Sequence, residues 1–205
     1  MRRSPSSRFA PGLPSLGYRS TQFRDCDDDL SLRFGRDGAL FIQGLLAADL
    51  VSDLGRRAAE SSFSTEPVAT IGVRSAETSG IIAAAISTML SRREVLDWVA
   101  ALVSDATITS ASGHVLRSTP AVGEELGWHD DLNEPDRRLA ITVDLLGEPY
   151  SGGEFQLRRG SDVIFRHRHA EAGGAVIFAI GRGLSHRVTP VTFGAGRLVY
   201  AGWFS

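Results

Sequence analysis

The sequence contains no lysine, and this absence excludes several kinds of active site. All 22 basic residues are arginine, so a lysine Schiff base, a pyridoxal anchor and a P-loop lysine are impossible. The single cysteine, Cys26, has no partner for an intrachain disulfide and cannot build a thiolate cluster for zinc or iron–sulfur. A bound metal would therefore need histidine, aspartate and glutamate ligands.

Excess charge and long apolar runs are also missing. The formal net charge of −2 is too close to zero to favour nucleic acid or an anionic membrane as partner. No apolar run approaches the ~20 residues of a membrane-spanning helix. Residues 1–20 are rich in Arg and Ser, contain no acid and lack the apolar core of a secretory signal. They predict a disordered tail on a cytoplasmic protein, with a mitochondrial-type presequence as the alternative.

The 205 residues suit about one domain, which we place at 21–205 with helical support at about 37–105. A short strand is predicted at 39–43, followed by an amphipathic helix whose apolar residues recur at three- and four-residue steps. These residues are Leu46, Leu50, Val51, Leu54 and Ala58. Ser91 and Glu94 predict the capping box of a second helix. The segment 62–80, rich in Ser, Thr and Glu, is predicted to be a mobile loop.

From about residue 107 the chain becomes β-rich. Short runs separated by glycine-containing turns occur at 114–118, 138–146, 154–158, 162–168, 175–180 and 197–204. Runs of this length without helix-sized gaps are typical of an antiparallel sandwich or barrel. The predicted fold class is therefore α+β, mainly β, with N-terminal helices supporting a β core at about 107–205.

One constellation in the β region carries metal chemistry. His129 and Asp131 are two residues apart, so on an extended segment both side chains would point to the same face. His186, from a later strand, supplies a third donor. Two imidazoles and one carboxylate on one face of a metal leave the opposite positions open, as in non-haem Fe(II) oxygenases. Arg197, which opens the last strand, can bind a carboxylate through two hydrogen bonds.

Several stretches carry a wider resemblance: WHDD at 128–131, LLGEPYSGGEF at 145–155 and, most specifically, HRVTPVTFGAGR at 186–197. From about His114 to Ser205 the chain resembles the prolyl-4-hydroxylase-like 2-oxoglutarate/Fe(II) dioxygenases. The resemblance implies a double-stranded β-helix that uses Fe(II), 2-oxoglutarate and O₂.

Carried over by position, the resemblance assigns iron to His129, Asp131 and His186, and the distal carboxylate of 2-oxoglutarate to Arg197. Thr142 is our candidate for a second 2-oxoglutarate anchor, because the tyrosine of many relatives is missing. Related halogenases have Ala or Gly in place of the carboxylate ligand. Asp131 is intact, which disfavours halogenation.

The function implied is hydroxylation of an unactivated C–H bond in an amino-acid-like, peptidyl or small-metabolite substrate, with release of succinate and CO₂. Desaturation, cyclisation and epoxidation are related outcomes. Trp128 and Arg138 are candidate substrate contacts, whereas His167 and His169 are predicted to be structural or solvated. One alternative is a cupin-type metal dioxygenase that does not use 2-oxoglutarate, so that Arg197 has no co-substrate role. Another is a non-catalytic binding module on the same barrel.

Overall fold

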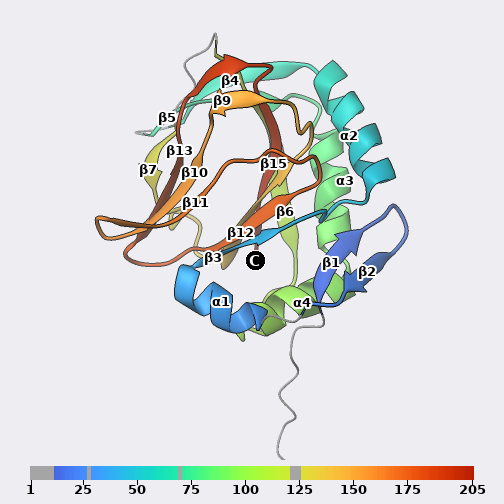
Figure 1. The fold of residues 1–205 in the computed structure, drawn as a ribbon, viewed down its shortest axis with the longest axis vertical. Helices are drawn as coiled ribbons and strands as arrows, with labels where there is room; N and C mark the ends of the chain where they lie inside the picture. The colour runs from blue at the N-terminus through green and yellow to red at the C-terminus, as the bar shows by residue number, and fades with distance from the viewer. Residues whose placement is uncertain (1–11, 27–28, 69–70, 121–125) are drawn as a thin grey trace, which may run out of the picture.

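The protein, described here by a computed structural model over residues 12–26, 29–68, 71–120 and 126–205, is built around one large antiparallel sheet (Figure 1). The helices are α1 (Leu30–Asp37), α2 (Ala48–Glu60), α3 (Ile81–Leu90) and α4 (Arg93–Val103). The N-terminal strands are β1 (Leu13–Leu16), β2 (Thr21–Arg24), β3 (Ala39–Ile42), β4 (Phe63–Val68) and β5 (Gly72–Glu77). The remaining strands are β6 (Ala111–Ser118), β7 (Leu126–His129), β8 (Leu139–Asp144), β9 (Tyr150–Gly152), β10 (Phe155–Arg159), β11 (Asp162–His167), β12 (Ala175–Ala179), β13 (Leu184–Val188), β14 (Val191–Gly194) and β15 (Arg197–Phe204).

The main sheet curls into a nearly closed barrel. Its strand order is β11-β10-β13-β7-β5-β6-β15-β8-β12-β3, with β4 added beside β5. Phe41 of β3 stacks on His167 of β11 at a ring centroid distance of 4.2 Å, so side chains from the two ends of the strand order meet. Two small two-stranded sheets, β1-β2 and β9-β14, lie outside it. The predicted α+β fold with a double-stranded β-helix core is confirmed.

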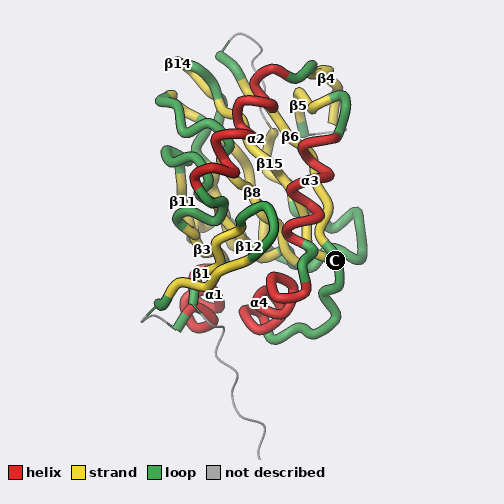
Figure 2. Tube along the Cα trace, turned by 90° about the vertical axis from the view of Figure 1, so that its right-hand side faces the viewer, coloured by secondary structure: helices red, strands yellow, loops and turns green. Residues whose placement is uncertain are grey.

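Alternation along the strands separates a helix-facing layer from the barrel interior. In β8, Leu139, Ile141 and Val143 belong to the large hydrophobic cluster shared with the helices, whereas Ala140 packs in a second, smaller cluster and Thr142 lines the barrel cavity. Successive side chains of a strand point to opposite faces, which explains this division. Figure 2 shows α2 and α3 lying along the outer side of the sheet that contains β6, β8 and β15. The helices therefore brace the strands that form one wall of the interior.

The predicted helix over the stripe from Leu46 to Ala58 is confirmed as α2, but the capping box is wrong. Helix α4 begins after Arg92, and Ser91 ends α3. The Ser91 hydroxyl instead accepts a hydrogen bond from the Ala111 N–H at 2.9 Å. Its polar side chain therefore fastens the turn between α3 and α4 to the first residue of β6.

Two segments expected to lack regular structure contain strands. Leu13–Leu16 forms β1, and Leu16 is fully buried, so the prediction of a disordered tail over 1–20 is wrong for this stretch. Residues 1–11 lie outside the described residues. The 62–80 segment contains β4 and β5, paired antiparallel from Phe63–Glu77 to Val68–Gly72, instead of the predicted loop.

Within the described ranges, no helix combines the length and the apolar character needed to cross a bilayer.

Candidate active site

A cavity of about 730 Å³ lies inside the barrel. Strands from both sides of the barrel and the β4–β5 hairpin supply its walls. Five predicted site residues line it: His129, Asp131, His186, Thr142 and Arg197. The predicted metal ligands and the predicted co-substrate residues therefore share one space.

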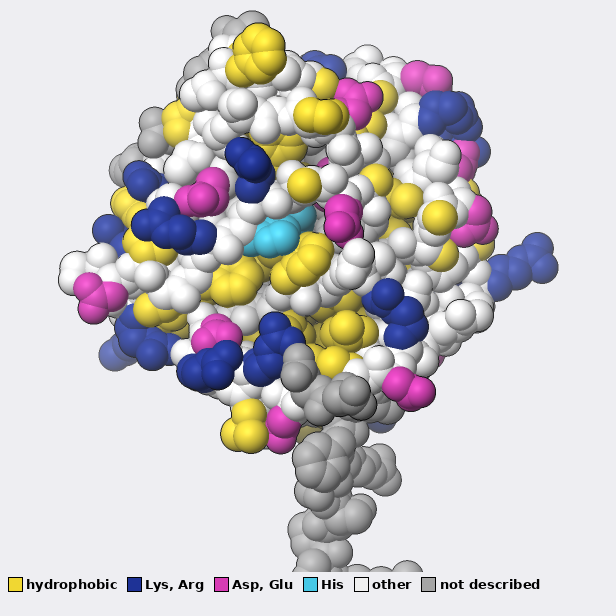
Figure 3. All heavy atoms as spheres, viewed as in Figure 1, with side chains coloured by type: hydrophobic (Ala, Val, Ile, Leu, Met, Phe, Trp, Pro, Cys, Tyr) yellow, Lys and Arg dark blue, Asp and Glu magenta, His cyan; other side chains and the backbone are white. Residues whose placement is uncertain are grey.

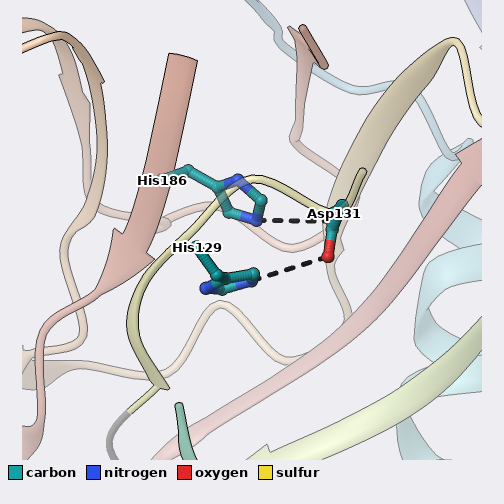
Figure 4. Close-up of side chains that lie close together, drawn as sticks. All are labelled: His129, Asp131 and His186. Atoms are coloured by element: carbon teal, nitrogen blue, oxygen red, sulfur yellow. Dashed lines mark ion pairs between the residues drawn. The ribbon is translucent and has the colours of Figure 1, made fainter. Parts of the chain in front are cut away.

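The three candidate metal ligands converge, as Figure 4 shows. β7 and β13 pair with His129 opposite His186, which brings the two imidazole centroids to 4.1 Å. Asp131 Oδ1 lies 3.7 Å from His129 Nε2, and its Oδ2 lies 3.5 Å from His186 Nε2. The potential ligand atoms all fall within 4.8 Å of one another. Among the described residues this is the one group of His, Cys, Asp and Glu side chains found at such spacing.

Asp131 reaches the histidines by a backbone path different from the predicted one. β7 ends at His129, and Asp131 adopts a left-handed conformation with a φ of 59° instead of continuing the strand. Aspartate is several-fold enriched in this region relative to other non-glycine residues. The Trp203 indole donates a hydrogen bond from Nε1 to Asp131 Oδ2 at 2.8 Å. The prediction of one extended H-x-D segment is wrong, although both side chains do meet.

The two histidines differ in their surroundings. His129 Nδ1 lies 2.7 Å from the Gly127 carbonyl and, because a carbonyl oxygen only accepts, Nδ1 donates to it, which leaves Nε2 as the nitrogen that faces Asp131. Burial, reinforced by the neighbouring His129, lowers the pKa of His186 to about 3. Neutral imidazole is the form that binds metal.

This donor set fits a divalent transition metal. Two imidazoles and one carboxylate suit Fe(II) and leave coordination positions for other ligands. Phe155 and Phe178 lie against the His186 ring, with centroid distances of 6.1 and 4.7 Å. Those aromatic rings limit the access of water to the His186 side of the site.

The Arg197 end of the cavity is buried and polar. Arg197 is only 5% exposed, and burial lowers the pKa of its guanidinium. In the described part of the chain, seven buried side-chain polar atoms lack a hydrogen-bond partner, and five belong to Arg197 and residues that interact with its charge. They are Asp144 Oδ2, Tyr150 OH, His167 Nε2, His169 Nδ1 and Arg197 Nε.

A buried polar group without a partner is costly, so such a concentration marks a place where a polar ligand fits. The Arg197 guanidinium matches a carboxylate in both charge and shape. The chemistry of this end of the cavity is therefore compatible with the distal carboxylate of 2-oxoglutarate.

The Thr142 hydroxyl contacts a buried histidine. Its Oγ1 lies 3.0 Å from His169 Nε2. His169 is 3% exposed, and burial holds its pKa well below the usual range. It is thus a structural residue and not a solvated one, and it fixes the position of the Thr142 hydroxyl beside the cavity.

The structure does not place the two predicted substrate contacts in the cavity. Trp128 is absent from its lining, and its ring contacts the guanidinium groups of Arg158 and Arg187, whose Cζ atoms lie 4.3 and 4.6 Å from the ring centroid. In a strand it must point away from the face used by His129, its neighbour. Arg138 is exposed and lies 3.7 Å from Asp105. Neither side chain therefore lines the cavity in which the other site residues meet.

Arg137 and Trp203 are cavity residues that sequence reasoning missed. Trp203 lies six residues after Arg197 in β15, so the two-residue period of a strand puts both on the same face. That signal was available in the sequence. Arg137 precedes β8 in an irregular segment, where no period predicts the direction of a side chain.

Solved structures share this fold. An oxidoreductase of the 2OG-Fe(II) oxygenase family from Burkholderia pseudomallei is 14% identical, with 89% of this chain and 94% of that chain covered and a TM-score of 0.64. A prolyl-4-hydroxylase from Pseudomonas putida is 22% identical, with coverage of 85% and 96% and a TM-score of 0.61. A Trichoplax adhaerens prolyl hydroxylase, in complex with a hypoxia-inducible-factor peptide, is 18% identical, with coverage of 85% and 86% and a TM-score of 0.65. No curated protein sequence matched.

The sequence itself carries the family signal. Residues 113–205, which contain all three candidate metal ligands and Arg197, match the family model described as the 2OG-Fe(II) oxygenase superfamily. The match confirms the predicted resemblance and the predicted cofactors, Fe(II) and 2-oxoglutarate with O₂. This segment of the chain belongs to the 2OG-Fe(II) oxygenase superfamily.

Proposed function

We propose that the protein is a 2-oxoglutarate/Fe(II)-dependent dioxygenase that hydroxylates a C–H bond of an amino-acid-like, peptidyl or small-metabolite substrate. The observation that carries the proposal is that a convergent His-Asp-His group and a buried arginine line one cavity. The arginine interacts electrostatically with four residues whose buried polar atoms lack partners. Oxidation of a substrate C–H bond, with release of succinate and CO₂, is the chemistry that the bound metal, co-substrate and O₂ supply.

In this proposal His129, Asp131 and His186 hold the metal. The hydrogen bond from the Trp203 indole fixes the Asp131 carboxylate, so the ligand needs little reorganisation when the metal arrives. The Gly127 carbonyl fixes the His129 tautomer in the same way.

Arg197 binds the distal carboxylate of the co-substrate, with Thr142 as a second anchor. As a neutral ring, His169 can donate to Thr142 from Nε2, which leaves the threonine hydroxyl hydrogen free to donate into the cavity. A carboxylate only accepts hydrogen bonds, so this tautomer is the one that suits it. Tyr150 lies next to the guanidinium without a hydrogen bond of normal geometry, and its hydroxyl is a further donor.

The type of reaction and the chemical class of the substrate are part of the proposal. Neighbours of this fold include an epimerase and a carbocyclase of nogalamycin biosynthesis, at 13% identity and TM-scores of 0.62 and 0.61. The fold is therefore compatible with several oxidations, and hydroxylation is the simplest. One rival, a cupin-type oxygenase without 2-oxoglutarate, gives Arg197 no co-substrate to bind. The other, a non-catalytic binding module, gives the complete His-Asp-His group no catalytic role.

A small molecule or a peptidyl residue is the expected partner, in the cytoplasm. On the face shown in Figure 3, acidic side chains lie among the basic ones, and this mixture does not favour a nucleic-acid surface.

The test is an anaerobic titration of Fe(II)-loaded protein with 2-oxoglutarate, followed by the visible absorption band of the chelate and by thermal shift. Wild type should show the band. His186→Ala should abolish it, and Arg197→Ala should weaken 2-oxoglutarate binding about 10- to 100-fold through the loss of a charge-assisted contact. Arg138→Ala, an exposed neighbour of the cavity residue Arg137, is the matched control and should behave as wild type.

Three results separate the candidate functions. Absence of the band from folded, iron-loaded wild type would contradict the use of 2-oxoglutarate. Retained affinity in Arg197→Ala would favour the cupin-type rival. Failure to hold iron would favour the binding module.

A further inference from the structure

The charged groups on the cavity wall near the metal ligands are not equivalent. Arg74 is neutralised by Glu66, whose Oε1 lies 2.6 Å from both Nε and Nη2 of the arginine. Asp130 accepts a hydrogen bond from the Leu132 N–H at 3.1 Å and so stabilises its own turn. Both groups have their main interaction within the chain.

Arg137 differs from them in geometry. Its guanidinium stacks on the Trp203 ring, with Cζ 3.8 Å from the ring centroid. Nη1 lies 3.9 Å from Asp131 Oδ1, which is beyond hydrogen-bond distance. No hydrogen bond from the guanidinium to another described residue is found. The side chain is 21% exposed and lines the cavity.

Stacking uses the flat face of a guanidinium and leaves the N–H groups at its edge available. The Trp203 platform is itself fixed, because its indole donates to Asp131 and its ring meets His114 edge-on at 6.1 Å. Arg137 is thus held in place beside the candidate metal ligands, and its guanidinium N–H groups remain available to a ligand. A preorganised arginine of this kind binds carboxylates through two parallel hydrogen bonds.

We propose that Arg137 is a specificity-determining residue that binds a carboxylate of the substrate next to the His129-Asp131-His186 group. This inference rests on the proposed function, because it assigns the substrate end of the same cavity. The substrate is then a carboxylic acid whose reacting C–H bond lies close to the acid group. With Arg74 paired to Glu66, Arg137 is a single cation available to substrate on this wall, which suits a monoanion better than a phosphate dianion.

The contact with Asp131 does not neutralise Arg137 once a metal is bound. A divalent metal on Asp131 would attract the negative charge of the same carboxylate, whose Oδ2 already accepts a hydrogen bond from Trp203. The positive charge of Arg137 is then left for a ligand from solution. Arg197 is the corresponding cation at the co-substrate end. Of the three arginines that line the cavity, Arg74 is paired with Glu66, so one arginine is left for each of two acids.

The test uses N-acetyl amino acids with apolar side chains as free acids, each paired with its primary amide. Binding to the anaerobic Fe(II)–2-oxoglutarate protein is followed by the change in the visible band, and succinate formation is measured in air. Wild type should bind the responsive acids at least about 10-fold more tightly than their amides. Arg137→Ala should lose that preference, Arg137→Lys should keep part of it, and Arg138→Ala should keep all of it.

The 2-oxoglutarate titration without probe separates the two proposals. If wild type binds no 2-oxoglutarate, the proposed function fails and this inference falls with it. If 2-oxoglutarate binds but acids and amides bind equally, or no acid binds, the substrate assignment alone is overturned. It is overturned too if Arg137→Ala keeps the preference for acids. A change in iron or 2-oxoglutarate affinity without a change in that preference would identify Arg137 as a support for Asp131.

Discussion

The layer between helices and sheet and the interior of the barrel are built on opposite principles. The first is a continuous apolar cluster in which residues such as Leu50, Ile86 and Tyr200 are fully buried. Even its polar Tyr200 hydroxyl has a partner, in Ser87 Oγ at 2.9 Å. The second holds a small apolar cluster beside most of the unpartnered buried polar atoms found among the described residues.

The difference teaches where stability and function are located. Apolar burial without unsatisfied groups stabilises the fold. Unsatisfied buried donors cost stability and persist where a ligand uses them. We therefore expect the helix–sheet layer to dominate the unfolding free energy and the barrel interior to dominate ligand affinity.

The largest expected effect is in the helix–sheet layer. Ile86→Ala should lower the free energy of unfolding by about 2–5 kcal/mol, because it leaves a cavity in a fully buried position. Arg197→Met, in the barrel interior, should lower it by less, because the apolar side chain removes a buried charge and the Asp144 carboxyl, whose pKa burial already raises, can take up a proton. Urea unfolding followed by circular dichroism measures both. Equal losses in the two variants would remove the distinction between the regions.

A pair of helical glycines sharpens the comparison with a smaller effect. A Cβ on Gly55 of α2 would lie 2.2 Å from the Leu145 carbonyl oxygen, so Gly55→Ala should destabilise by about 1–3 kcal/mol through overpacking. A Cβ on Gly35 of α1 would meet nothing within 4 Å, so Gly35→Ala should stabilise by about 1 kcal/mol. Thermal melts of both variants give the signs. A stabilising Gly55→Ala would mean that α2 can move away from the sheet.

The smallest effect is a pH dependence that originates in the barrel interior. Burial lowers the pKa of His169, so the folded protein keeps this ring neutral while the unfolded chain protonates near pH 6.5. Its contribution to stability is complete above the unfolded pKa and is lost as the pH falls below it, by up to about 1.4 kcal/mol per pH unit. Unfolding free energies between pH 7 and 5.5 should fall less steeply in His169→Gln, which cannot titrate. Identical slopes would show that folding does not lower the pKa of His169.

Sequence patterns predicted the elements whose apolar residues recur at a regular spacing. The helical stripe from Leu46 to Ala58 and the β-rich runs after residue 107 became α2 and the barrel strands, because a periodic apolar face must pack on a core. The H-x-D pair and the distal histidine named three residues that do converge.

Most of the wrong predictions concern residues whose side-chain direction is not set by the period of a helix or strand. Asp131 and Arg137 lie just outside strands, so alternation does not give their direction. Ser91 satisfied a capping pattern, but a tertiary contact with Ala111 fixed its side chain instead. Trp128 is a different case, because alternation from His129 does predict that it faces away. His169 was predicted to be structural or solvated and is structural, but its contact with Thr142 could not be predicted, because that contact depends on the closure of the whole barrel.

The left-handed backbone at Asp131 has a consequence for how this site can evolve. A φ of 59° strains most side chains, but glycine adopts it without cost. Replacement of the carboxylate ligand by glycine, a substituent found in the related halogenases, would therefore relax the local chain while it opens a coordination position. Of the three candidate metal ligands, Asp131 alone has this positive φ, and His129 and His186 lie in strands. The position at which a glycine would change the coordination is thus the one where the backbone accepts glycine most readily.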